Sequence, residues 1–300
     1  MQQKSVNLLA RLALFGAAFI WGTSFIVVKN TVDVFTPNIL LAFRFTIGCL
    51  ILAVVFHKRL NALNLDFLKK GCLTGIMLYL AYSVQTIGIT DTTPGKNAFL
   101  TAVYCVLVPF FFWAVDKTRP DLFHFAAAFL CIIGIGLVTL DGDLSIRMGD
   151  ALTLLSGIFY ACHVVAIAKL GRGKDPVVFT ILQFATAAVC SWVVGLATES
   201  LPTQVTAETV GGLLFLAVFA TAGSLLLQNV GQRYTDPTAA SILLSLEAPF
   251  GVLFSALFYG EELSARLLIG FAFIFVAILT SETKLSFLTK LLPGRAAKEG

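Results

Sequence analysis

The chain has 300 residues, of which 58% are hydrophobic and only 13% are charged, with a mean hydropathy of +0.89. Soluble domains carry about 25% charged residues, so this composition excludes an ordinary soluble protein and indicates an integral membrane protein. The formal net charge is +4. No GxxxxGK[ST] motif occurs, which excludes a nucleotide-driven pump encoded in this chain. The six cysteines lie in apolar stretches without metal-ligand spacing and are interpreted as packing residues.

Ten continuous apolar stretches follow along the chain, each near the length of about 20 residues that a helix needs to cross a bilayer. They cover residues 10–29, 37–56, 70–90, 96–115, 121–140, 149–169, 176–198, 209–231, 237–258 and 264–281. Barrel strands would alternate apolar and polar residues, so these stretches are predicted to be helices. The first stretch lacks a small-residue cleavage site and is predicted to remain as a span. The expected fold class is an all-α integral membrane protein with ten transmembrane helices.

The two halves of the chain repeat each other. At an offset of 139 residues, Pro37 and Phe45 recur as Pro176 and Phe184, while Trp21 and Arg44 align with Tyr160 and Gln183. At an offset of 143 residues, Gln85, Gly88, Thr92 and Pro94 recur as Gln228, Gly231, Thr235 and Pro237. A repeat of this length is far longer than a solenoid unit and fits half a transporter. Because each half holds five helices, an odd number, the two repeats are predicted to be inverted. The predicted division is 1–141, 149–281 and a cytoplasmic tail, 282–300.

The loops carry an uneven distribution of Lys and Arg. Alternate loops and termini on one side of the predicted membrane hold 16 of these residues and the other side holds 4, with Arg44 inside a span. By the positive-inside rule, both termini should be cytoplasmic and residues 141–148 should lie outside. Asp141 and Asp143 in that outer loop are interpreted as a helix-terminal turn, and the apolar positions after 284 predict a tail on the membrane surface. The expected location is the bacterial inner (plasma) membrane.

Polar and aromatic residues within the spans are the candidate substrate-binding residues, because such groups are costly in lipid and tend to face a cavity. They are Trp21, Tyr79, Tyr82, Gln85, Tyr104, Tyr160, His163, Gln228 and Glu247. Arg44 is interpreted as a structural cation that caps carbonyl groups or pairs with Glu247. Glu247 is expected to pair with Arg44, to bond Gln228, or to face the substrate and bind a proton. His163 is a packing residue or a cavity residue, and the two glutamines bond between helices or line the cavity.

The remaining motifs favour structural interpretations. Gly71 and Gly75 form a GxxxG pattern, which is typical of close helix packing. His163 lies seven residues after Ser156, two turns along the predicted helix, which is too far to activate that hydroxyl as a nucleophile. No cofactor or metal is expected.

Several motifs resemble one known family. Phe19–Phe25 (FIWGTSF), Thr93–Thr101 (TPGKNAFLT) with Val108-Pro109, Ser245–Pro249 (SLEAP) and Gly260-Glu261 are similar to the EamA family of the drug/metabolite transporter superfamily. The resemblance extends over roughly residues 10–281. It implies ten helices in two inverted repeats around a central cavity, with Trp21, Tyr104, Tyr160 and the Glu247–Pro249 segment at its border.

The resemblance also implies bending points at Pro109 and Pro249, and secondary transport of small metabolites, often export of amino acids. This sequence differs from other members of the superfamily at two points, which concern the proton-carrying residue and the class of substrate. The first predicted helix has no glutamate, unlike the small multidrug exporters, whose glutamate there carries the proton. Arg44 is the one cationic candidate near the cavity, which argues against a dianionic sugar phosphate.

The function expected from the sequence is secondary active transport of small amphipathic metabolites such as amino acids, with export as the expected direction. A facilitative uniporter, an exchanger or a channel is the alternative, and an intramembrane enzyme has too few clustered chemical groups to name a reaction. The expected partners are a small-molecule substrate and the lipid bilayer, with proton coupling through Glu247 as an open alternative. Nucleic acid is not an expected partner, and both a monomer and a homodimer fit the sequence.

Overall fold

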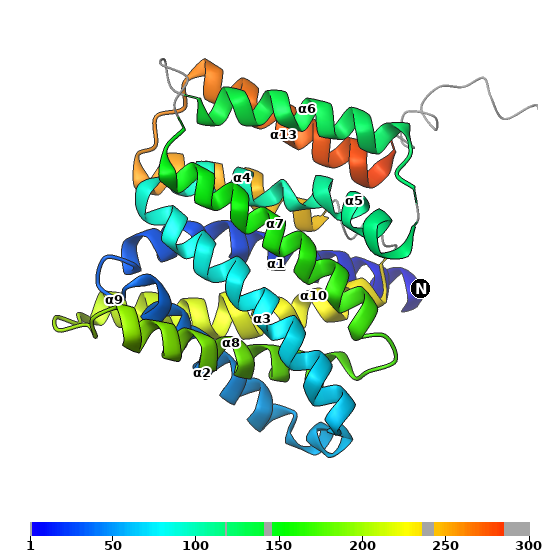
Figure 1. Cartoon of the computed structure of the whole chain (residues 1–300), viewed down its shortest axis with the longest axis vertical. Helices are drawn as coiled ribbons and strands as arrows, with labels where there is room; N and C mark the ends of the chain where they lie inside the picture. The colour runs from blue at the N-terminus through cyan, green and yellow to red at the C-terminus, as the bar shows by residue number, and fades with distance from the viewer. Residues whose placement is uncertain (1, 118, 141–145, 236–242, 285–300) are drawn as a thin grey trace, which may run out of the picture.

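The computed structural model describes residues 2–117, 119–140, 146–235 and 243–284 (Figure 1). These residues form helices and contain no strand, apart from one isolated bridge between Leu140 and Ile146. The elements are α1 (Gln2–Thr31), α2 (Pro37–Val55), η1 (His57–Ala62), α3 (Leu65–Gly88), η2 (Ile89–Asp91), α4 (Pro94–Ala102), α5 (Tyr104–Asp116), α6 (Leu122–Thr139), α7 (Met148–Leu170), α8 (Pro176–Thr198), α9 (Ala207–Leu214), η3 (Phe215–Gly223), α10 (Ser224–Arg233), α12 (Glu247–Phe254), η4 (Ser255–Tyr259) and α13 (Ala265–Thr283).

The predicted all-helical membrane protein is confirmed. In the described part of the chain, nine helical segments are long and apolar enough to cross a bilayer, and a shorter apolar helix covers Leu243–Tyr259. The start of the predicted ninth span at 237–242, the turn at Asp141 and Asp143, and the tail after 284 lie outside the described residues.

The helix boundaries follow from local chemistry. Proline occupies the first position of α2, α4 and α8, where its missing N–H is not needed. Thr93 and Asp175 accept hydrogen bonds from backbone N–H groups in the first turns of α4 and α8. Gly260 ends η4 with φ of 74°, in the left-handed region that favours glycine.

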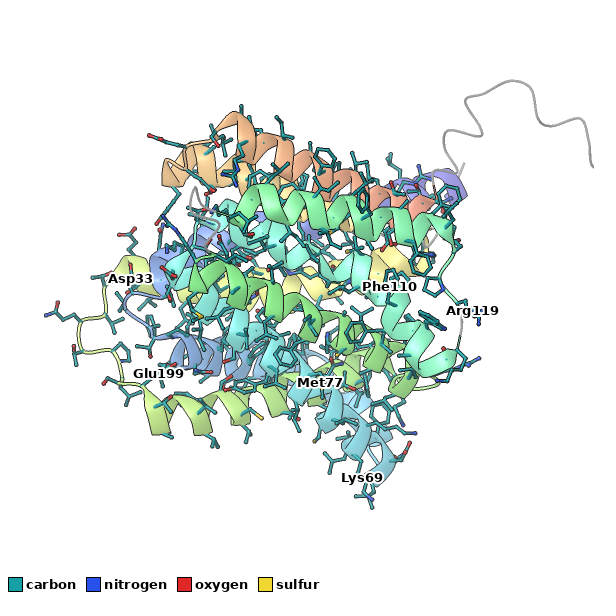
Figure 2. All side chains as sticks on the ribbon, turned by 45° about the horizontal axis from the view of Figure 1, so that its top comes forward. Asp33, Lys69, Met77, Phe110, Arg119 and Glu199 are labelled. Carbon is teal, nitrogen blue, oxygen red and sulfur yellow. The ribbon has the colours of Figure 1, made fainter. Side chains whose placement is uncertain are left out.

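The helices run up and down, so the connections gather at two ends of the molecule. We call one the basic end; it holds the start of α1, η1 and residues 171–175. The opposite end holds residues 89–93 and 199–206 (Figure 1). Figure 2 shows Lys69 and Arg119 at the basic end and Asp33 and Glu199 at the opposite end. This arrangement follows the alternation of basic loops in the sequence.

Eight of the ten predicted spans surround the centre of the molecule. Helix α3 packs against α7 and α8, α2 against α8, and α1 against α10 and α12, whereas α6 and α13 pair with each other at one edge (Figure 1). A Cβ atom at Gly71 or Gly75 would lie 2.7 Å from Leu182 Cβ or 2.6 Å from Thr186 Cβ of α8. The prediction of close helix packing at this GxxxG pattern is therefore confirmed.

Two spans are interrupted at equivalent positions of the repeat. The fourth predicted span divides at Val103, between α4 and α5, and the described part of the ninth divides at Leu246, just before α12. These positions are 143 residues apart, the offset found between the halves. Pro249 contributes to the second interruption because it has no N–H for the carbonyl four residues earlier, whereas α5 continues through Pro109.

Candidate functional site

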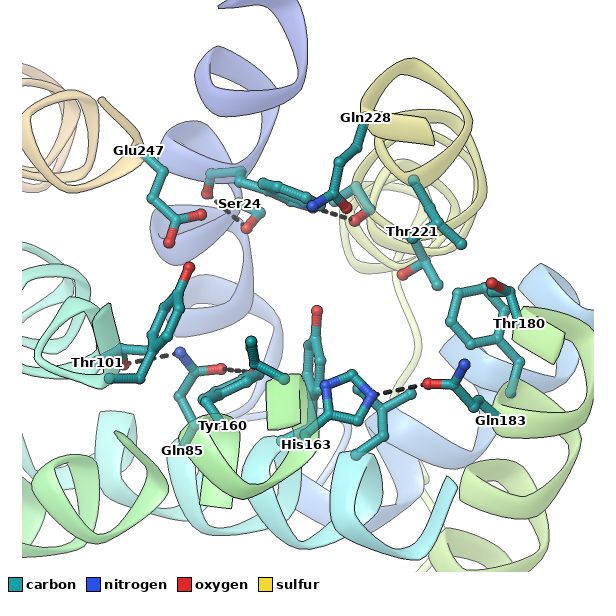
Figure 3. Close-up of a pocket in the computed structure, with 18 of the residues that line it drawn as sticks. Ser24, Gln85, Thr101, Tyr160, His163, Thr180, Gln183, Thr221, Gln228 and Glu247 are labelled. Atoms are coloured by element: carbon teal, nitrogen blue, oxygen red, sulfur yellow. Dashed lines mark hydrogen bonds between the residues drawn. The ribbon is translucent and has the colours of Figure 1, made fainter. Parts of the chain in front are cut away.

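A cavity of about 340 Å³ lies between the two halves of the chain (Figure 3). Helices α1, α2, α3, α4, α5, α7, α8, α10 and α12 and segment η3 contribute to its wall, and α6 and α13 do not. Its lining residues with a polar side-chain atom are Trp21, Ser24, Arg44, Tyr82, Gln85, Thr86, Asn97, Thr101, Tyr104, Tyr160, His163, Thr180, Gln183, Thr221, Gln228 and Glu247, and Phe25, Phe179 and Phe184 add aromatic surface.

Among the described residues, the cavity lining reaches the surface at the basic end. There it includes Gly171, in the connection between α7 and α8, and the exposed Pro176, the first residue of α8. Toward the opposite end the last lining residues are Val28, Ile89 and Asn97, which are 8%, 1% and 0% exposed. The described residues therefore form a vestibule that is closed at its far end, not an open pore.

An ion pair closes the opposite end. Lys96 at the start of α4 lies 3.2 Å from Asp150 at the start of α7, measured from Nζ to Oδ2. The carboxylate of Asp150 also accepts a hydrogen bond from Thr92, and Asp91 accepts one from Gly149 N at 3.0 Å. Asp150 is 0% exposed, so this pair is shielded from water on the carboxylate side. These contacts join the α3–α4 connection of the first half to the second half.

Glu261, which follows η4, adds further contacts between the halves. Its carboxylate accepts hydrogen bonds from the hydroxyl of Thr93 and from Gly95 N, the latter at 3.0 Å. Within the first half, Lys29 Nζ donates to the carbonyl oxygens of Ile89 at 2.7 Å and Thr92 at 3.0 Å. The α3–α4 connection is thus held by groups from α1, from α7 and from the segment after η4.

The repeat-equivalent aromatics Trp21 and Tyr160 both donate hydrogen bonds to the other half of the chain. Trp21 Nε1 donates to the carbonyl of Ala220 at 2.8 Å, and the hydroxyl of Tyr160 donates to Gln85 Oε1 at 2.9 Å. Gln85 Nε2 in turn donates to Thr101 at 2.9 Å. Trp21, Gln85 and Tyr160, which the sequence analysis named as candidate cavity residues, all line this cavity. Figure 3 shows Gln85 and Tyr160 side by side in its wall.

The wider turn of η3 presents polar groups to the cavity. This segment is π-helical, and its Thr221 hydroxyl donates to the carbonyl of Leu216, five residues earlier, at 2.8 Å. Such wide turns are rare and frequently occur at functional sites. Here the same segment provides the carbonyl of Ala220 for Trp21 and the hydroxyl of Thr221 for Arg44.

Tyr82, Tyr104 and Tyr160 form an aromatic wall. The ring of Tyr160 lies 5.4 Å from that of Tyr82 and 5.9 Å from that of Tyr104, between centroids. His163 Nε2 donates to Gln183 Oε1 at 2.7 Å, so this histidine lines the cavity and also has a hydrogen-bond partner. Large aromatic surfaces with a few fixed polar atoms are typical of small-molecule sites.

Arg44 and Glu247 supply the two formal charges of the lining, but they do not form an ion pair with each other in the described structure. Arg44 Nε donates to Thr221 Oγ1 at 2.6 Å, and its guanidinium carbon lies 4.9 Å from the centre of the Tyr82 ring. The carboxylate of Glu247, the first residue of α12, has no hydrogen bond with Gln228 or with another described residue. The expected partnerships of Arg44 and Gln228 with Glu247 are therefore not found.

Tyr79, expected in the cavity, lies elsewhere. Its hydroxyl donates to Asn38 Oδ1 at 3.0 Å, and its ring packs in the apolar core between α2, α3 and α8. Pro109 and Pro249 are likewise absent from the cavity lining. Sequence reasoning did not select Ser24, Asn97, Thr101, Thr180 or Thr221, because hydroxyl and amide side chains within a span have no periodic signal that separates cavity from helix packing.

The chain is similar to known proteins in both sequence and fold. The sequence model of the EamA-like transporter family matches this chain twice, over residues 8–140 and 147–282. An uncharacterized transporter of Archaeoglobus fulgidus is 31% identical over 91% of this chain and 85% of its own length. The uncharacterized transporter YvbV of Bacillus subtilis is 26% identical over 88% of each chain.

One solved crystal structure has a similar fold. It superposes with a TM-score of 0.66 over 95% of this chain and 99% of that one, at 17% sequence identity. At this identity the likeness concerns the fold alone.

Proposed function

Because this chain belongs to the EamA-like transporter family and is a multi-pass membrane transporter, we propose that it moves small amphipathic metabolites such as amino acids by alternating access. The observation that carries this proposal is the cavity between the two halves, open at the basic end and closed at the other by polar contacts between those halves. A carrier must close one end while the other is open, and inverted repeats provide two related ends for this purpose.

The two matches of the family model support the division into repeats at 1–141 and 149–281, with 282–300 as a tail. The loop bias supports a cytoplasmic location for both termini and for the basic end, and the proposed membrane is the bacterial inner membrane. With this orientation the structure represents an inward-open state. Export is the proposed direction because the family resemblance implies it; a substrate entering from the cytoplasm would then leave outside after the contacts around Asp150 separate.

The lining supports an amphipathic substrate. Trp21, Tyr82, Tyr104 and Tyr160 offer aromatic surface, and Gln85 and Gln228 offer amide groups beside it. A bare ion would need a compact set of oxygen ligands, and no group of three or more His, Cys, Asp or Glu residues suited to a metal occurs in the part of the chain that is described. Amino acids combine the required apolar and polar groups within a small volume.

Two measurements test this proposal. Purified protein is screened by thermal unfolding against amino acids and related metabolites, because a compound that binds only the folded state raises its stability. Stabilising compounds are then followed in proteoliposomes. Saturable flux with counter-exchange of the unchanged compound supports a carrier. Flux that does not saturate indicates a channel, and a chemically altered compound indicates an enzyme.

A matched pair of variants refines the screen. Tyr160→Phe removes the hydroxyl that donates to Gln85 within the cavity, and Tyr79→Phe removes one that donates to Asn38 outside it. We expect the first variant to change the order of preferred substrates and the second to retain the wild-type order. The same order in both variants would contradict the assignment of the cavity.

A more specific form of the proposal is that Glu247 couples transport to protons, since this carboxylate faces the cavity without a described partner. Glu247→Gln retains the shape of the side chain and removes its ability to release a proton. The variant should still exchange substrate but lose transport driven by a pH gradient. Full gradient-driven transport by this variant would exclude the role.

A further inference from the structure

Arg44 is buried to a degree that normally requires an anionic partner. Its side chain belongs to α2 near the middle of the span, and the residue is only 3% exposed. A buried guanidinium is costly unless its charge is compensated and its N–H groups are bonded. The described residues offer no carboxylate within ion-pair distance of it, although Glu247 lines the same cavity.

The structure leaves one edge of the guanidinium group available. An arginine side chain has five N–H donors, of which one is on Nε and four are on the two Nη atoms. Nε is engaged by Thr221 at 2.6 Å, and Tyr82 covers one face of the group at 4.9 Å from the ring centre. Neither Nη atom has a hydrogen-bond acceptor among the described residues, and Arg44 lines the cavity. Thr221 and Tyr82 therefore hold the group in a fixed orientation without satisfying it.

We propose that the free Nη edge of Arg44 binds the carboxylate group of the transported substrate. Two parallel N–H donors match the two oxygens of a carboxylate, whereas a point cation would not select this geometry. Among the described residues the lining contains no second Lys or Arg, so a singly charged group fits and a phosphate dianion does not. The apolar part of the substrate would then lie against Tyr82 and Tyr160, whose rings are 5.4 Å apart.

This inference rests on the proposed function, since it assigns a role within the same cavity. It replaces the structural interpretation of Arg44 drawn from sequence, because no backbone carbonyl in the described residues accepts from its Nη atoms. It also explains the difference between the repeats. At the equivalent position the neutral Gln183 is bonded to His163 at 2.7 Å and to the carbonyl of Phe179 at 3.3 Å, so this position offers no cationic edge to the cavity.

Chemical modification of arginine tests the site without knowledge of the natural substrate. Phenylglyoxal is applied to the purified protein, and its reaction at Arg44 and at the exposed Arg172 is followed by mass spectrometry. Phenylacetate and phenylacetamide are the protecting probes, since they share a shape and differ in charge. At ten times its Kd, phenylacetate should slow modification of Arg44 by about tenfold. Phenylacetamide should leave that rate nearly unchanged, and neither probe should affect Arg172.

Three results would overturn the proposal: equal protection of Arg44 by the acid and the amide, no protection by the acid, or no reaction at Arg44 while Arg172 reacts. Variants provide a second measurement. The preference for phenylacetate over phenylacetamide, measured by thermal shift, should fall by about tenfold in Arg44→Lys, which retains the charge but not the fork, and should vanish in Arg44→Gln. The control Arg172→Gln should retain it. If Arg44→Gln does not fold, the protection of Arg44 by phenylacetate in the wild-type protein still tests the proposal.

The outcome is separable from that of the proposed function. A protein that transports metabolites but shows no acid-specific protection of Arg44 lacks the carboxylate site. A protein that shows this protection but carries no compound across proteoliposomes has the site and lacks the transport function.

Discussion

Replacing Asp150 by asparagine should favour opening of the end that is closed in this structure. Asp150 is fully buried, pairs with Lys96 at 3.2 Å and accepts a hydrogen bond from Thr92. Asparagine has nearly the same shape and retains an oxygen for the Thr92 hydroxyl, but it removes the negative charge. The substitution therefore weakens one contact between the halves and leaves the surrounding packing in place.

The size of the effect follows from the environment of the pair. A hydrogen bond to a charged group contributes about 1.5–3 kcal/mol. The Lys96 side chain is 17% exposed, so water compensates part of its loss, and we take the low end of the range. About 1.4 kcal/mol corresponds to a tenfold change in an equilibrium constant. Because the pair exists only while this end is closed, the open population should rise by about tenfold.

Thiol labelling measures this shift. A single cysteine replaces Ser24, a cavity residue that is 8% exposed, in a background without the six native cysteines. An impermeant thiol reagent is added to the outside of intact cells. The labelling rate should rise by about tenfold in Asp150→Asn. Exchanging the two charges, with Lys96→Asp and Asp150→Lys together, should lower it again toward the starting value.

Asp66→Asn is the matched control. Asp66 pairs with Lys70 at 2.9 Å and with Lys174 at 2.7 Å, but at the basic end and in an exposed position. This variant should leave the labelling rate unchanged. The reasoning is refuted if Asp150→Asn folds normally and labels at the starting rate, or if Asp66→Asn accelerates labelling equally.

Three further predictions concern topology, gating and pH. A cysteine at Thr203 should react with an impermeant reagent from outside and one at Arg172 only after lysis; the reverse pattern would invert the proposed orientation. Pro249→Ala should slow transport more than it weakens ligand binding, because proline maintains the interruption before α12; equal losses would argue against a hinge. Burial alone would raise the pKa of Glu199, but donors from Asn38 and Ile39 outweigh it and hold the pKa below its ordinary value of 4.5. The ionised Glu199 carboxylate therefore stabilises the fold fully at pH values above 4.5, and this stabilisation is lost as the pH falls through the lower pKa of the folded state. The decline of Tm in acid should therefore be smaller in Glu199→Gln than in wild type.

Particular residues show which features of the structure could be predicted from the sequence. Most boundaries of the described spans could be predicted to within a few residues, because apolar length is required by the bilayer and because proline or capping residues mark several starts. The start of α1 is an exception, since this helix begins at Gln2, well before the predicted start at residue 10. The shared residues of the two halves predicted that Trp21 and Tyr160 are equivalent, and both donate hydrogen bonds across the cavity. These features depend on local or repeated sequence, which a single chain displays directly.

Partnerships between distant side chains could not be predicted in this way. Arg44 and Glu247 are the obvious charge pair in the sequence, yet Arg44 contacts Thr221 and Tyr82. Tyr79 and Tyr82 lie three residues apart on α3, and only Tyr82 lines the cavity. Helix rotation and packing decide such differences, and the periodicity of a continuously apolar span does not report them.

The sequence by itself determined that the protein crosses the membrane as helices, that it is built from two related halves, and that its basic loops alternate along the chain. The reason is that hydrophobic length, repetition and charge are properties of the chain before it folds. Only the tertiary structure decided which end of the cavity is closed, because Lys96 and Asp150 are separated along the chain by two complete spans and meet through packing. It also decided that one edge of Arg44 faces the cavity, since the orientation of a buried side chain depends on neighbours contributed by both halves.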